Sequence, residues 1–168
     1  MHTRSLARAV AWFALLATGC VSERAESLEA GASPDQITGK SYRLERAYLV
    51  SVHVPSADVD KVLAAAVAAV GLDYGEYDQV AYLDAPGLEQ FRPREGAKAG
   101  AQVAATSAQT TSASFSVPRD SAVLQKALDA VYTAHSYEEP VIYVREVWRT
   151  RATNPDDSNP NRWWSRVR

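Results

Sequence analysis

Two segments of the chain, 63 positions apart, repeat the same order of residue types. Val52–Pro55 (VHVP) and Phe115–Pro118 (FSVP) both alternate in the manner of a strand, end in proline and precede a helical pattern. When the second segment is aligned with the first by this shift of 63 positions, Tyr137 aligns with Tyr74 without a gap. The pattern indicates an internal duplication, so the fold must contain the same structural unit twice.

Hydrophobic periodicity defines the first unit. Alternating apolar residues predict a strand that ends at Pro55, because proline lacks the N–H group that would continue the ladder. Ser56 is the expected N-cap of the following helix. Apolar residues at helical spacing from Val59 to Val70 form one stripe, and Gly71 suits a left-handed C-terminal cap.

The second unit has a similar helical stripe, which begins after Asp120 or Ser121. The predicted strands are Ala47–Val54, Gln79–Leu83 with an extension near Phe91, Ser112–Val117 and Val141–Trp148. Two βαβ units in tandem predict an α+β fold, the ferredoxin-like (βαβ-βαβ) sandwich, in which both helices cover one face of a mainly antiparallel sheet. The other face is then wet, covered by the tails or buried against another copy.

The N-terminus has the layout of an export signal. Arg4 and Arg8 precede a short apolar stretch, which closes with the small residues Thr18-Gly19-Cys20. The stretch is too short to span a bilayer comfortably. Its last four residues resemble the lipobox of bacterial lipoproteins, in which Cys20 becomes the lipidated N-terminus; the alternative is an ordinary signal peptide.

These features predict four parts: a signal peptide over residues 1–19, a lipidated cysteine and flexible tether over 20–43, a folded domain over 44–151 and a tail over 152–168. The expected location is the bacterial cell envelope, on a lipid-anchored membrane facing the periplasm. Without lipidation the protein is expected to be secreted or periplasmic. Cys20 is the only cysteine, so no intrachain disulfide forms.

Charge excludes one class of partner. The formal net charge is −2 and residues of both signs are interspersed. Such a chain lacks the basic patch or stripe that nucleic-acid binding requires. We therefore expect no nucleic-acid partner.

Three ordered blocks of residues carry a family resemblance. They are Gly75-Glu76-Tyr77-Asp78, then Gly87 with Phe91-Arg92-Pro93-Arg94-Glu95-Gly96-Ala97, then His135-Ser136-Tyr137-Glu138-Glu139-Pro140. Together they resemble the CutA-like, PII-like domain inserted in proteins of the Nif-three-like (YqfO) family, a domain that also occurs alone. The resemblance covers about Arg46 to Val147.

The chain also departs from that family. It has Ser136 where proline is usual and Glu89 where a second glycine is usual. The di-metal catalytic halves of full-length relatives are missing, so their activity is not implied. The third block is also similar to the CutA family of divalent-cation-tolerance proteins, whose members are homotrimers; their cysteine-rich and tryptophan-bearing strand motifs are missing here.

Histidine and carboxylate residues raise the question of a metal site. His135 and Glu138 could bind copper or zinc, because imidazole nitrogen and carboxylate oxygen suit both ions. His53 or a neighbouring copy would have to supply further ligands. The alternative is structural: His135 caps the second helix, Tyr137 packs and Glu138 pairs with an arginine.

Arg92 and Arg94 flank a rigid proline on the loop of the second block. With Tyr137, Glu138 and Glu139 they form a candidate site for an anion or for the carboxylate of a partner. The alternative is an internal salt bridge from Arg92 or Arg94 to Glu138 or Glu139, which would tie the two signature loops together.

Catalysis is not expected. The chain has no Gly-x-Ser-x-Gly elbow and no phosphate-binding glycine loop. Trp163 and Trp164 in the basic tail suit either a membrane interface or a position over the open sheet face. The sequence predicts a non-catalytic, lipid-anchored protein whose CutA-like domain self-associates, most simply as a homotrimer, for binding or scaffolding; the alternative is a CutA-type metal-binding protein.

Overall fold

The structure is a computed structural model that describes residues 33–39 and 41–153. The predicted signal peptide, Cys20 and the Trp163-Trp164 pair lie outside the described residues. The elements are η1 (Pro34–Gln36), β1 (Tyr42–Pro55), α1 (Val59–Val70), β2 (Ala81–Leu83), β3 (Gly87–Phe91), β4 (Thr106–Pro118), α2 (Ser121–Ala134) and β5 (Ile142–Ala152).

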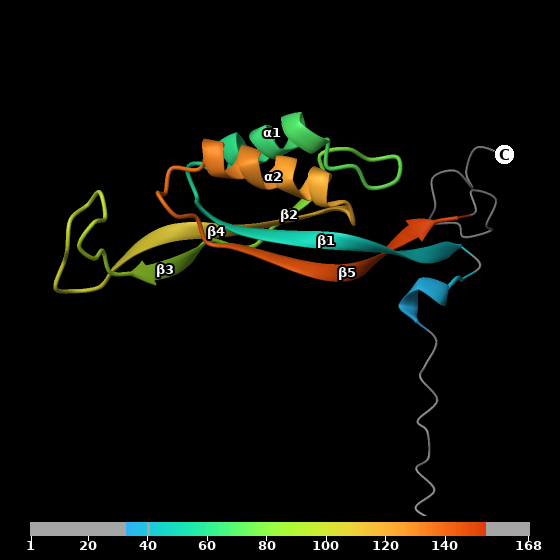
Figure 1. Ribbon diagram of the computed structural model, residues 1–168, viewed down its shortest axis with the longest axis horizontal. Helices are drawn as coiled ribbons and strands as arrows, with labels where there is room; N and C mark the ends of the chain where they lie inside the picture. The colour runs from blue at the N-terminus through green and yellow to red at the C-terminus, as the bar shows by residue number, and fades with distance from the viewer. Residues whose placement is uncertain (1–32, 40, 154–168) are drawn as a thin grey trace, which may run out of the picture. The chain divides into compact units, whose positions relative to one another are not determined.

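All the strands belong to one antiparallel sheet. Their order is β2-β4-β1-β5, and β3 also pairs with β4. Both helices lie side by side on one face of this sheet (Figure 1). The predicted ferredoxin-like α+β fold is therefore confirmed.

The second strand of the predicted fold is divided in two. β2 and β3 both pair with β4, and the residues between them, 84–86, are outside any strand. Pro86 lies in this gap and has no N–H group to donate to the ladder. This edge of the sheet consequently consists of two short strands, β2 and β3, separated by residues 84–86.

Three strands extend beyond their predicted bounds. β1 begins at Tyr42 and β5 ends at Ala152, so the two strands form a two-stranded ribbon beyond the end of β4. β4 begins at Thr106 rather than at Ser112. Apolar alternation did not indicate these extensions, because their side chains are mainly charged or hydroxylated.

The structure also describes a short 3-10 helix, η1, that precedes residue 44. Asp35 of η1 accepts hydrogen bonds from the indole Nε1 of Trp148 at 2.7 Å and from Arg46 Nε at 2.9 Å. The guanidinium of Arg46 lies over the Trp148 ring, 5.4 Å from its centroid. Side-chain contacts thus hold a segment that was predicted to belong to a flexible tether.

The core lies between the helices and the sheet. Alternate residues of β1 point to the helices and are buried, and their neighbours across the sheet are buried with them. The buried side chains of this core include Val50, Val52, Val54, Val62, Ala66, Leu72, Phe115, Val117, Ala127 and Val131. The intervening residues of β1 and β4 face away from the helices, which leaves one sheet face without a helical layer.

The helix ends differ in one respect from expectation. Asp120 caps α2, and its carboxylate accepts hydrogen bonds from two backbone N–H groups of the first turn. Asp58, not Ser56, is the N-cap of α1, and its side chain makes no capping hydrogen bond. The Ser56 hydroxyl instead lies 3.1 Å from the Thr111 hydroxyl on β4. Gly71 ends α1 with a φ of +76°, as predicted.

Among the residues that the structure describes, neither α1 nor α2 has the length and apolar character needed to cross a membrane.

Candidate functional site

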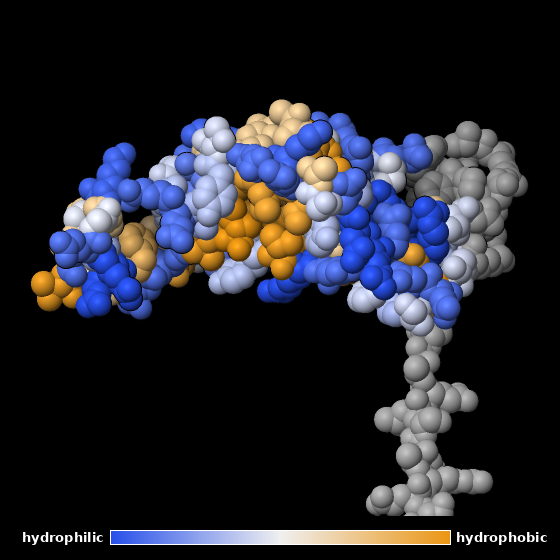
Figure 2. Space-filling view, viewed as in Figure 1, coloured by the Kyte–Doolittle hydropathy of each residue, from blue (hydrophilic) through white to orange (hydrophobic). Residues whose placement is uncertain are grey.

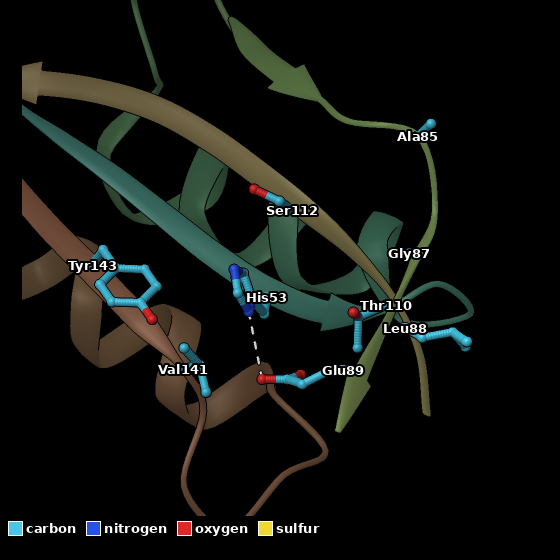
Figure 3. Close-up of a pocket in the computed structure, with 9 residues that line it drawn as sticks. All are labelled: His53, Ala85, Gly87, Leu88, Glu89, Thr110, Ser112, Val141 and Tyr143. Carbon is cyan, nitrogen blue, oxygen red and sulfur yellow. Dashed lines mark hydrogen bonds and ion pairs between the residues drawn. The ribbon is translucent and has the colours of Figure 1, made fainter. Parts of the chain in front are cut away.

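A pocket of about 350 Å³ lies where β1, β3, β4 and the start of β5 meet. His53, Ser112 and Tyr143 reach it from positions that alternate with core residues, so they point away from the helices. Figure 3 shows these side chains around a shared hollow. The complete lining is His53, Ala85, Gly87, Leu88, Glu89, Thr110, Ser112, Val141 and Tyr143.

His53 and Glu89 form the charged part of this pocket. The Nδ1 atom of His53 lies 3.4 Å from Oε1 of Glu89, and Figure 3 marks this interaction. The other carboxylate oxygen, Oε2, is buried and has no hydrogen-bond partner in the part of the chain that the structure describes. A carboxylate in this position leaves one acceptor unsatisfied, at a cost in free energy.

Aromatic rings surround the His53–Glu89 pair. The rings of His53 and Tyr143 meet edge to face, with centroids 5.7 Å apart and planes at 68°. Tyr137 packs against Phe91 of β3, with ring centroids 6.3 Å apart. Burial raises the pKa of the Tyr137 phenol, and the nearby carboxylate of Glu89 raises it further. Tyr137 is therefore a neutral phenol beside an anionic pocket.

His135 is a structural residue of the corner between α2 and β5. Its Nδ1 accepts the backbone N–H of Tyr137 at 3.0 Å, so the ring proton is on Nε2. Nε2 donates to the carbonyl oxygen of His53 at 2.9 Å. Both nitrogens of this buried imidazole are thus engaged, which leaves no free lone pair for a metal ion.

The structure does not bring the predicted metal ligands His135, Glu138 and His53 together. His135 uses both nitrogens within the fold, and the Glu138 carboxylate binds a different loop. In residues 33–39 and 41–153 no group of three or more His, Cys, Asp or Glu side chains could hold one metal ion. Copper or zinc binding through this set would need rearrangement of the corner.

The two signature loops are tied together, but not by the predicted salt bridge. The carboxylate of Glu138 accepts the backbone N–H of Lys98 at 3.0 Å. Arg92, Arg94 and Glu139 are exposed, and no salt bridge joins either arginine to Glu138 or Glu139 within the described residues. A role of these exposed residues in binding a ligand or partner stays a prediction.

A second polar cluster lies on the ribbon of β1 and β5. Glu45 accepts hydrogen bonds from Nε of Arg149 at 2.9 Å and from Nε of Arg151 at 2.7 Å. Both guanidiniums lie over the Tyr74 ring, which the turn containing Gly75 presents. Although burial alone raises the pKa of Glu45, the hydrogen bonds from the arginines bring it below the ordinary value. Tyr74 directly precedes the first signature block, so this cluster lies beside that turn.

Glu89 and Tyr143 were not predicted as site residues, and neither were the hydroxyl residues Thr110 and Ser112. Ser112 was assigned to a strand from the sequence, whereas Thr110 lies in the part of β4 that the sequence did not predict. The position of Glu89 depends on the pairing of β3 with β4, which places Glu89 opposite Ala108. No local pattern fixes that pairing.

Comparison with known proteins shows the fold alone. No protein-family model matches the sequence, and no curated protein matches it. Among solved structures, a Bacillus cereus protein related to NIF3 is similar over 64% of this chain, with a TM-score of 0.54 and 23% sequence identity. The match covers 27% of that protein, so this chain corresponds to about a quarter of it.

CutA1 structures are also similar, at a lower level. The divalent ion tolerance protein CutA1 from Ehrlichia chaffeensis matches 61% of this chain and 82% of its own, with a TM-score of 0.47 and 10% identity. CutA from Xylella fastidiosa matches 60% of this chain and 83% of its own, with a TM-score of 0.46 and 13% identity. Likeness at this level does not by itself establish a shared role.

Proposed function

We propose that this chain is a non-catalytic, lipid-anchored protein of the bacterial cell envelope, whose CutA-like domain self-associates as a homotrimer and serves as a binding or scaffold module. The observation that supports self-association is that the edge strands of the sheet each have a partner strand on one side only. Within the described residues β5 pairs only with β1, while β2 and β3 pair only with β4.

Both edges carry large apolar side chains in contact with solvent. On β2 and β3, Tyr82 is 68% exposed and Leu88 is 78% exposed. On β5, Tyr143 and Val144 are exposed as well. Figure 2 shows a hydrophobic area on the β5 side of the domain, between the helices and β5. Strand edges of this kind pair readily with another chain unless they are protected.

The two edges differ, which favours a ring. A contact between unlike edges is head to tail, and such a contact closes into a ring when the rotation per copy allows it. Every copy in the ring then has both edges covered. The number three is proposed from the resemblance to CutA, and the lipid anchor is proposed from the sequence around Cys20.

Two edge variants test this arrangement. Val144→Arg places a charge on the β5 edge, and Leu83→Arg places one on the β2 edge. The matched control is Tyr132→Arg, which changes an exposed side chain on α2, away from both edges. Light scattering of the chain from Val21 to Arg168 should give a trimer for the parent and the control. Each edge variant alone should be monomeric, because one of its two edges cannot pair.

Mixing the two edge variants separates a ring from a symmetric dimer. In a head-to-tail arrangement the intact β5 edge of Leu83→Arg still pairs with the intact β2 edge of Val144→Arg. The mixture should therefore contain heterodimers and no trimers. A parent chain that stays monomeric at micromolar concentration would contradict the proposal, as would edge variants that assemble like the control.

Metal binding is the second candidate, and the distance between His53 and Glu89 favours it. Nδ1 of His53 and Oε1 of Glu89 lie 3.4 Å apart, which places both within reach of one ion, and a neighbouring copy would have to supply the further ligands that zinc requires. Zinc and copper titrations of parent, His53→Ala and His135→Ala chains test this candidate. Loss of binding in His53→Ala but not in His135→Ala is expected; equal, weak binding by all three chains would exclude it.

A further inference from the structure

The pocket beside His53 has the dimensions of a small-molecule site. Its volume of about 350 Å³ is at the lower end of the range for ligand pockets, roughly 300 to 1,000 Å³. Gly87 in its wall has no side chain, and a Cβ atom there would meet no atom within 4 Å. The hollow is thus far larger than a single metal ion requires.

The polar groups of the pocket select for a ligand that donates hydrogen bonds. Its lining includes the Glu89 carboxylate and the hydroxyls of Thr110 and Ser112, but no lysine or arginine. Oε2 of Glu89 is buried without a donor in the described part of the chain. The Glu89 carboxylate carries the negative charge of the pocket lining, and a cationic donor in the pocket would be attracted to it.

The remaining walls suit an organic ligand. The Tyr143 ring is half exposed at one side of the pocket (Figure 3), and ammonium groups are attracted to aromatic rings. Val141 adds apolar surface to the lining. A hydrated anion finds no positive charge there other than a protonated His53. A bare metal ion would leave the apolar walls unused.

We propose that this pocket binds the ammonium group of a small aliphatic amine. Glu89 is its counter-charge, Tyr143 forms the aromatic wall, and the alkyl chain lies on Val141. This inference goes beyond the proposed self-association, but Tyr143 also lies on the β5 edge that the proposed assembly would cover, so binding is to be measured on a chain that cannot assemble. The edge variant Leu83→Arg is such a chain and should bind the amine.

The test is an NMR titration of the full Leu83→Arg chain with pentylamine, with pentanol and pentanoate as matched probes without positive charge. Pentylamine should shift the resonances of Tyr143 and Val141, and the two other probes should bind at least roughly tenfold more weakly, because they lack the positive charge that pairs with Glu89. Equal binding of pentanol or pentanoate would overturn the proposal.

Two pocket variants and one control complete the test. Glu89→Gln keeps the shape and removes the charge, so it should weaken pentylamine binding at least roughly tenfold. Tyr143→Leu should weaken it roughly fivefold through loss of the aromatic wall. Glu76→Gln, on an exposed carboxylate outside the pocket, should change nothing. Unchanged binding in Glu89→Gln would refute the amine site.

Discussion

The imidazole of His135 holds together two segments that are far apart in the chain. Its two nitrogens bind the His53 carbonyl and the Tyr137 N–H, which lie on β1 and on the corner before β5. A histidine beside two carboxylates suggested a metal ligand, because the sequence does not show what each nitrogen contacts. The partner on β1 is 82 positions away, so only the folded chain reveals it.

Replacing His135 with alanine should therefore reduce stability rather than metal affinity. The change leaves a buried carbonyl and a buried N–H without partners, which should lower the free energy of unfolding by about 2 kcal/mol. Urea denaturation measures the loss, with His53→Ala as a control that keeps the backbone carbonyl. The free energy of unfolding of His135→Ala should fall by the same amount with and without EDTA. A destabilisation that is seen only when metal is present would instead identify His135 as a metal ligand.

At the scale of elements, the two helices begin in different ways. Asp120 caps α2 with its carboxylate, whereas Asp58 begins α1 without a side-chain hydrogen bond. The sequence offered Ser56 as the cap of α1, since serine is a favoured N-cap residue. The proximity of Thr111 on β4 draws the Ser56 hydroxyl away from the helix, and the helix then begins two residues later.

This difference predicts unequal effects of equivalent substitutions. Asp120→Ala should lower the free energy of unfolding by about 1 kcal/mol through loss of the N-cap. Asp58→Ala is the matched control and should cost clearly less, because no capping hydrogen bond is lost. Thermal and urea denaturation of both variants check the order. Equal losses would show that the Asp120 hydrogen bonds contribute little.

The contact between η1 and β5 should depend on pH. The hydrogen bond from Trp148, aided by Arg46, holds the pKa of Asp35 below its ordinary value. A carboxyl group whose pKa is lower in the folded state stabilises that state above the unfolded pKa, and this contribution is lost as the pH falls through the folded pKa. The contact should therefore be complete at neutral pH and weaken below the usual carboxyl range.

The indole N–H resonance of Trp148 reports this contact directly. It should move toward its free position as the pH falls, and Asp35→Asn should remove most of the pH dependence. Salt should weaken the ion pair with Arg46, since both side chains are partly exposed. A Trp148 resonance that stays constant as the pH falls below the usual carboxyl range would contradict the arrangement.

At the scale of the whole molecule, the proposed anchor determines where the domain acts. Cys20→Ser should release the protein from the membrane fraction, because serine cannot form the thioether that carries the lipid. Fractionation of cells that produce the parent and the variant measures this, and Ser22→Ala serves as a neighbouring control. Unchanged membrane retention of Cys20→Ser would contradict lipid anchoring.

The sequence by itself determined the order of strands and helices, the duplication and the ferredoxin-like fold. These properties depend on local alternation, helical spacing and residues such as Pro55 and Gly71, and each acts within a few residues. It did not determine the split at Pro86 or the charged ribbon of β1 and β5, because neither carries an apolar pattern.

Only the tertiary structure decided which polar groups meet. His53 and Glu89 are 36 positions apart, and Glu138 and Lys98 are 40 apart. Their meeting depends on the register of β3 against β4 and on the path of the loop before β4. A shift of one residue in register would point Glu89 to the other face of the sheet, so the pocket is a property of the assembled sheet and not of any one segment.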